Sequence, residues 1–180
     1  METTHISSRI RSSDLSWGPL TETVFHTDTP LRVTEIMYNP APPPEGSPFD
    51  RREFEYIELQ NVSADTLDLR GVRFVEGIRF DFTDSAVTEL GPGEVVVLVE
   101  DIQGFASRYD LARILVAGEY SGALSDGGER ISILGPLGEP VADFEYSDLW
   151  HVETDGQGAS LVIADAQGEL ASCLLYTSDA

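Results

Sequence analysis

The sequence has no lysine, only one cysteine and no long apolar run. Its 11 basic residues are all arginine and are outnumbered by 32 acidic residues, which gives a formal net charge of −21. A single thiol can form neither an internal disulfide nor a cysteine-based zinc site. A surface this acidic repels phosphate, which excludes non-specific binding to nucleic acid or to an anionic membrane. No stretch approaches the roughly 20 apolar residues of a membrane-spanning helix.

Apolar residues are nevertheless abundant enough to fill a core. They make up 41% of the 180 residues and include 16 aromatic side chains, a composition that argues against disorder. The length suits one domain of about 140–150 residues with flanking segments. Residues 31–170 contain nine arginines and 27 acidic residues, so a charge of −18 belongs to the domain itself. This acidity favours cationic groups, basic proteins or polymers bridged by divalent ions as partners.

Both ends of the chain differ in character from residues 31–170. Residues 1–30 are expected to be the end of a preceding β domain or a linker. A strand-like sequence around residues 20–25 is followed by the linker-like segment Thr27-Asp-Thr-Pro30. A disordered leader is the open alternative. No signal peptide is recognisable at the N-terminus. Residues 171–180 are expected to be a non-native tail, because the segment from Cys173 to Ala180 resembles a translated sequencing adapter.

Alternating apolar and polar residues predict a series of short strands with one buried face. About eight such segments are expected, at residues 31–36, 56–59, 67–69, 78–82, 95–99, 131–133, 142–146 and 161–163. Val95–Val99 is apolar throughout, which indicates a central strand covered on both faces. The alternation that begins at Leu31 slips at Glu35-Ile36, which predicts a β-bulge.

One segment has helical rather than strand spacing. Ile102, Phe105 and Tyr109 fall at i, i+3 and i+7, and Asp101 stands where a helix-capping residue is expected. Many short strands with one short helix predict an all-β antiparallel sandwich. Trp150 is expected to fill the space between the sheets or to shield one end of it.

Six segments, in the same order, resemble the lamin-tail domain family in its bacterial form. They cover about 130 residues and read Leu31-Arg-Val-Thr-Glu-Ile-Met-Tyr-Asn-Pro40, Glu53-Phe-Glu-Tyr-Ile-Glu-Leu-Gln-Asn61, Leu67-Asp-Leu-Arg-Gly-Val72, Leu90-Gly-Pro-Gly-Glu94 with its continuation to Asp101, Tyr120-Ser-Gly-Ala-Leu-Ser-Asp-Gly-Gly-Glu-Arg130, and Gly156-Gln-Gly-Ala-Ser-Leu161. The resemblance implies an immunoglobulin-like β-sandwich and supplies no catalytic motif. Val72 stands where the family commonly has tryptophan, and the segment that usually follows the last strand is missing.

Carboxylates are the main candidates for chemistry. Glu53, Glu55 and Glu58, or Asp81 and Asp84, could be read as acid/base pairs, but nothing in the sequence indicates a sugar cleft between them, so a solvated acidic face is expected.

Calcium is the one metal for which the sequence offers weak ligands, because hard cations prefer several oxygens on one loop. The candidates are Asp126 and Glu129 in one turn, and Glu153 and Asp155 in another. Neither turn has an alternating Asp-x-Asp-x-Asp-Gly pattern. A glycine turn explains both without metal.

We therefore expect a non-catalytic structural, adhesive or protein-interaction module. It would form part of a larger secreted or surface-attached bacterial protein, and bind a protein or a cell-surface polymer. One alternative is an accessory module that targets an attached hydrolase or nuclease domain to its substrate. Another is an intracellular scaffold similar to the lamins. The domains encoded beside it in the full-length gene discriminate among the three.

Overall fold

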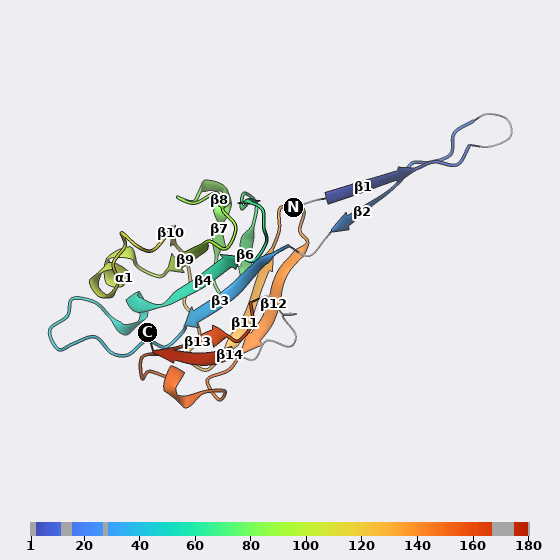
Figure 1. Cartoon of the computed structure of the whole chain (residues 1–180). Helices are drawn as coiled ribbons and strands as arrows, with labels where there is room; N and C mark the ends of the chain where they lie inside the picture. The colour runs from blue at the N-terminus through green and yellow to red at the C-terminus, as the bar shows by residue number, and fades with distance from the viewer. Residues whose placement is uncertain (1–2, 12–15, 27–28, 167–174, 180) are drawn as a thin grey trace.

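Two β-sheets with a shared apolar core form the body of the protein in the computed structural model (Figure 1). The structure describes residues 3–11, 16–26, 29–166 and 175–179. The larger sheet has the order β10 (Val116–Glu119), β9 (Val95–Val99), β4 (Tyr56–Asn61), β3 (Leu31–Met37), β13 (Ala159–Ile163) and β14 (Leu175–Asp179). The smaller sheet has the order β12 (Pro140–Tyr146), β11 (Glu129–Leu134), β6 (Arg73–Glu76) and β7 (Phe80–Asp81). The all-β, sandwich-like fold predicted from the sequence is therefore confirmed.

Shorter elements complete the fold. They are the paired strands β5 (Leu67–Asp68) and β8 (Glu89–Leu90), the helix α1 (Ile102–Arg108), and the 3-10 turns η1 (Arg51–Phe54), η2 (Phe82–Asp84) and η3 (Val152–Thr154). The predicted helix cap is present, because the Asp101 carboxylate accepts a hydrogen bond of 2.6 Å from the backbone N–H of Gly104. The single short helix is confirmed within the described residues.

Strand β9, which is apolar throughout, is covered on both of its faces. Val96 and Leu98 are buried in the core between the sheets, whereas Val97 and Val99 belong to a second apolar cluster on the outer face. Phe105 of α1 covers that second cluster. The prediction of a central strand covered on both faces is thus confirmed, and the outer face carries the site described below.

The strands differ from the sequence prediction in number and direction. Eleven strands, β3 to β13, lie between residues 31 and 163, against about eight expected, because β6, β8 and β10 are too short or too irregular to show alternation. The predicted strand at 78–82 is only two residues long, since the chain turns into η2 at Phe82. Strand β10 pairs parallel to β9, and α1 lies in the crossover that a parallel pair requires.

The prediction that Trp150 fills the space between the sheets is wrong. Its side chain is 47% exposed and lies in the loop after β12, not between the sheets. The core is instead closed by other large residues, including Tyr38, Phe82 and Tyr146, which are all fully buried. A bulky apolar side chain therefore did not identify a core position here.

The ends of the chain add two strand pairings. Strands β1 (Thr3–Ser8) and β2 (Thr21–His26) form a hairpin that projects away from the body in Figure 1. Strand β14 pairs antiparallel with β13. Cys173 lies outside the described residues. The prediction that residues 171–180 are a non-native tail, with a translated adapter from Cys173 onward, concerns the origin of the gene sequence, and it stays a prediction.

Candidate functional site

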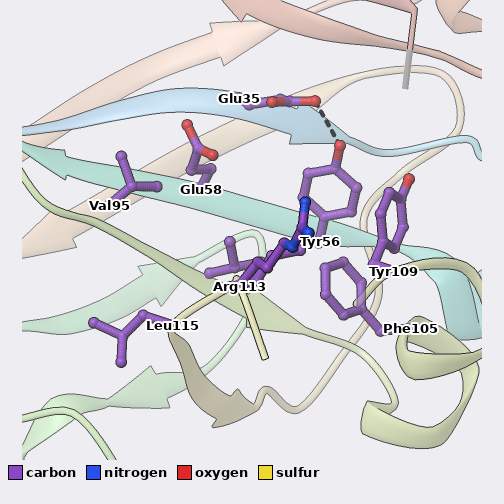
Figure 2. Close-up of a pocket in the computed structure, with 10 residues that line it drawn as sticks. Glu35, Tyr56, Glu58, Val95, Phe105, Tyr109, Arg113 and Leu115 are labelled. Carbon is purple, nitrogen blue, oxygen red and sulfur yellow. Dashed lines mark hydrogen bonds between the residues drawn. The ribbon is translucent and has the colours of Figure 1, made fainter. Parts of the chain in front are cut away.

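A pocket of about 400 Å³ lies on the outer face of the larger sheet, beside α1 (Figure 2). Strands β3, β4 and β9 form its floor, and the chain between α1 and β10 forms its rim. Alternation along β4 directs Ile57 and Leu59 into the core and leaves Tyr56 and Glu58 on the pocket side. The floor of the pocket is therefore built on regular strands, and its rim on a loop.

Two carboxylates lie side by side in this pocket. Glu35 of β3 and Glu58 of β4 are direct cross-strand partners in the antiparallel ladder. The ladder register shifts between Val33 and Glu35, which is the bulge that the sequence predicted near this position. Like charges directly opposite each other destabilise a sheet. Bulges often re-aim side chains at functional sites, and this one places Glu35 against Glu58.

Hydrogen bonds fix one oxygen of each carboxylate. Oε1 of Glu35 accepts bonds of 2.5 Å from the hydroxyls of Tyr56 and Ser160, and Oε1 of Glu58 accepts one of 2.6 Å from Thr34. Within the described residues, neither Oε2 has a hydrogen-bond donor and neither carboxylate forms an ion pair. Two rigidly held carboxylates thus keep free acceptor oxygens.

The surroundings of Glu58 disfavour its charged form. Burial raises the pKa of Glu58 above its ordinary value of 4.5, and the nearby charge of Glu35 raises it further. The hydrogen bond from Thr34 acts in the opposite direction but does not cancel these effects. A positive charge placed in the pocket would relieve this repulsion.

Three aromatic rings line the pocket beside the carboxylates. Phe105 and Tyr109 are stacked at 4.5 Å between ring centroids, and Tyr56 meets both edge-on, at 5.5 Å from Phe105 and 5.8 Å from Tyr109. Figure 2 shows the hydroxyls of Tyr56 and Tyr109 pointing to the same side, with that of Tyr56 bonded to Glu35. Helix α1 supplies Phe105, and Tyr109 caps its C-terminal end.

Close packing of α1 on η1 holds this aromatic group in place. Gly104 is buried there, and a Cβ at this position would lie only 2.4 Å from the backbone oxygen of Glu53. The absence of a side chain at Gly104 therefore lets α1 pack closely on η1, which fixes the position of the helix that supplies Phe105.

Aliphatic side chains complete the pocket on its other side. They are Val95, Val97, Ile114 and Leu115, of which Leu115 is 43% exposed. The one basic residue that lines the pocket, Arg113, forms an exposed ion pair of 3.5 Å with Asp110 rather than with either carboxylate. The pocket therefore combines negative charge at one end with an apolar wall.

This geometry suits binding better than hydrolysis. Glycosidase carboxyls must lie on opposite sides of the bond they cleave. Glu35 and Glu58 stand next to each other on adjacent strands of one sheet face, not on opposite sides of the pocket. A cationic group with an apolar stem fits both the charge and the walls.

Three of the four calcium candidates are engaged in structural contacts. Asp126 pairs with Arg51 at 3.0 Å, and Oε1 of Glu129 accepts a bond of 2.8 Å from the N–H of Ser125. Oδ1 of Asp155 accepts a bond of 2.6 Å from the side-chain amide of Asn39.

Glu153 is exposed in η3. Across the described residues, no group of three or more acidic, histidine or cysteine side chains is arranged to hold a metal ion. A guanidinium, that of Arg51, occupies the position beside Asp126.

The expectation of a solvated acidic face fails for one of the other carboxylates. Glu55 is completely buried, and its Oε2 accepts bonds of 2.9 Å from the N–H of Leu124 and 3.1 Å from the Tyr120 hydroxyl. Burial raises its pKa from the ordinary 4.5 to about 7, against the lowering effect of these bonds and of Arg52. Because no surface of Glu55 is accessible, it cannot touch a substrate.

The chain matches no family model, no curated protein and no solved structure. The lamin-tail resemblance and the immunoglobulin-like topology stay predictions. Among the described residues, no helix has the length and apolar character needed to cross a membrane.

Proposed function

We propose that the chain is a non-catalytic protein-interaction module, and that it binds positively charged segments of its partners through the pocket on β3, β4 and β9. The observation that carries this proposal is the cross-strand pair Glu35 and Glu58, which lies against an aromatic and aliphatic wall and forms no ion pair with any arginine in the described structure. The strongly acidic composition of residues 31–170 supports the same preference, because it attracts basic partners and slows the approach of acidic ones.

The wider context follows the family resemblance. We propose a lamin-tail-like module in a secreted or surface-attached bacterial protein, in which the sandwich provides spacing and attachment. The six matching segments support this assignment, and the sandwich-like fold agrees with it. The buried position of Glu55 and the side-by-side position of Glu35 and Glu58 support a role in binding rather than catalysis.

A peptide array tests this function, because it samples many possible partner sequences at once. The whole chain is applied to immobilised random octapeptides at about 0.15 M salt, where exposed charges more than about 8 Å apart are largely screened. We expect peptides that contain basic residues next to apolar ones to be retained. Binding should be lost in the double variant Glu35→Gln/Glu58→Gln.

The matched control is Glu45→Gln/Glu153→Gln, which removes the same charge from exposed positions outside the pocket. It should retain the same peptides as the native chain. If both double variants lose binding equally, the attraction is one of overall charge and the proposed pocket function is refuted. If the pocket variant keeps all of its peptides, the function is refuted as well.

A further inference from the structure

We propose that the pocket receives the side chain of an arginine from a partner protein, with its guanidinium at Glu35 and Glu58 and its methylene stem against the aliphatic wall. This inference rests on the proposed function and names the group that is recognised. It is carried by four features of the pocket: its unbalanced charge, the number and position of its free acceptors, its apolar side and its rigidity.

Unbalanced charge is the first feature. The two carboxylates lie side by side as register partners on β3 and β4. The described structure holds no arginine within ion-pairing distance of either carboxylate. Arg113, the basic residue on the rim, is paired with Asp110 instead. An incoming cation would therefore gain two partners and remove a repulsion that the fold otherwise retains.

The number and position of acceptors favour guanidinium over ammonium. Oε2 of Glu35 and Oε2 of Glu58 are free within the described residues and belong to adjacent strands. Guanidinium presents several N–H donors in a flat, fixed fork, which can bond to two neighbouring carboxylates at once, whereas ammonium is a compact point charge. Tyr109, a half-buried ring that lines the same pocket and stacks on Phe105, adds an aromatic group of the kind that attracts guanidinium.

The apolar side of the pocket fits the rest of an arginine side chain. Val97, Ile114 and Leu115 line it, and Leu115 is 43% exposed. Arginine is amphipathic, because three methylene groups separate its charge from the backbone. A bare metal ion would use none of this wall, and two carboxylates fall short of the six to eight oxygens that Ca²⁺ prefers.

Rigidity lowers the entropic cost of binding. Hydroxyls of Tyr56, Ser160 and Thr34 already hold the two carboxylates, and Figure 2 shows Glu35 and Glu58 on neighbouring strands at one end of the pocket. A ligand would not need to order these side chains when it binds.

The test is an NMR titration of the whole chain with Nα-acetyl-arginine amide. Saturable shifts are expected at backbone amides around the pocket, such as those of Tyr109 and Leu115, with an affinity in the millimolar range. The neutral isostere Nα-acetyl-citrulline amide should cause no saturable shift, and the lysine analogue should bind at least several-fold more weakly. CaCl₂ should not displace the arginine probe at matched ionic strength.

Variants give the inference a second readout. Glu58→Gln should weaken binding of the arginine probe by roughly tenfold or more, since it removes a charged hydrogen bond. Glu45→Gln should leave the affinity within about twofold. Glu58→Gln keeps a carbonyl oxygen for the Thr34 hydroxyl and removes the like-charge pair, so a native amide spectrum is expected. A Glu35→Gln chain provides an independent test of the same pocket.

Equal binding of citrulline or lysine, displacement by Ca²⁺, or shifts that do not saturate would overturn the inference. The outcome is separable from that of the peptide array. Peptides that depend on the pocket but contain no arginine would leave the proposed function intact and refute this inference. If arginine amide binds the pocket while the array retains no peptide, the recognition of arginine is supported and the proposed binding of partner segments is refuted.

Discussion

Replacing Glu55 by glutamine should make the protein less sensitive to pH. Glu55 is completely buried, and its second oxygen, Oε1, has no hydrogen-bond partner in the described structure. The guanidinium of Arg52 is its nearest countercharge, at 3.9 Å, and is largely exposed. Burial therefore outweighs the favourable contacts and raises the pKa of Glu55 from 4.5 to about 7.

The direction of the effect follows from proton binding. Between pH 4.5 and 7 the folded chain keeps a proton on Glu55 that the unfolded chain has released. The stabilisation is fully present below pH 4.5 and is lost as the pH rises through about 7. A pKa difference of this size corresponds to about 3 kcal/mol in the free energy of unfolding. Glutamine has no proton to lose in this range, so its contribution stays constant.

Urea unfolding at a series of pH values measures this effect. The difference in unfolding free energy between Glu55→Gln and the native chain should rise by about 3 kcal/mol, in favour of the variant, from pH 4.5 to 8. Other raised carboxyls, such as Glu58 and Glu100, are present in both chains and largely cancel. Glu45→Gln serves as the control for the loss of one exposed carboxyl group. A difference for Glu55→Gln that does not change with pH would refute the argument.

Three further substitutions test the fold by urea unfolding. Asn61→Ala should cost about 2–3 kcal/mol, because the buried side-chain amide donates to the backbone oxygens of Leu90 and Gly91, both at 2.9 Å; a loss below about 1 kcal/mol would contradict this. Gly128→Ala should cost about 1–3 kcal/mol, because φ is +102° and a Cβ would lie 2.4 Å from the oxygen of Tyr146; unchanged stability would show that the turn is misplaced. Trp150→Ser should change stability by less than about 0.5 kcal/mol, and a larger loss would restore Trp150 to the core.

Local patterns in the sequence predicted the local parts of the fold. The apolar run Val95–Val99 and the spacing of Phe105 and Tyr109 follow from short-range geometry, and Asp101 marked the start of α1. Strand partners at long sequence separation are not encoded in such patterns. The opposition of Glu35 and Glu58 across 23 residues of chain depends on the register of β3 against β4, which the sequence alone did not supply.

The alternation of apolar residues in β4 did indicate that Glu55 is buried, although its acidic side chain suggested an exposed position. Continuing the inward positions Leu59 and Ile57 backwards by two residues reaches Glu55, which places its side chain on the core side. Acidic residues are so seldom buried that a solvated face was the ordinary expectation. The partners that compensate for burial, Tyr120 and the N–H of Leu124, lie more than 60 residues further along the chain.

The most direct test of the central claim is the carboxyl pKa of Glu58, measured by carbon-detected NMR with and without Nα-acetyl-arginine amide. In the free protein the pKa should lie above 4.5, because of burial and the adjacent Glu35. Saturating probe should lower it, because the guanidinium stabilises the charged carboxylate. A pKa that is the same with and without the probe would contradict the account, since no cation would then be bound between Glu35 and Glu58.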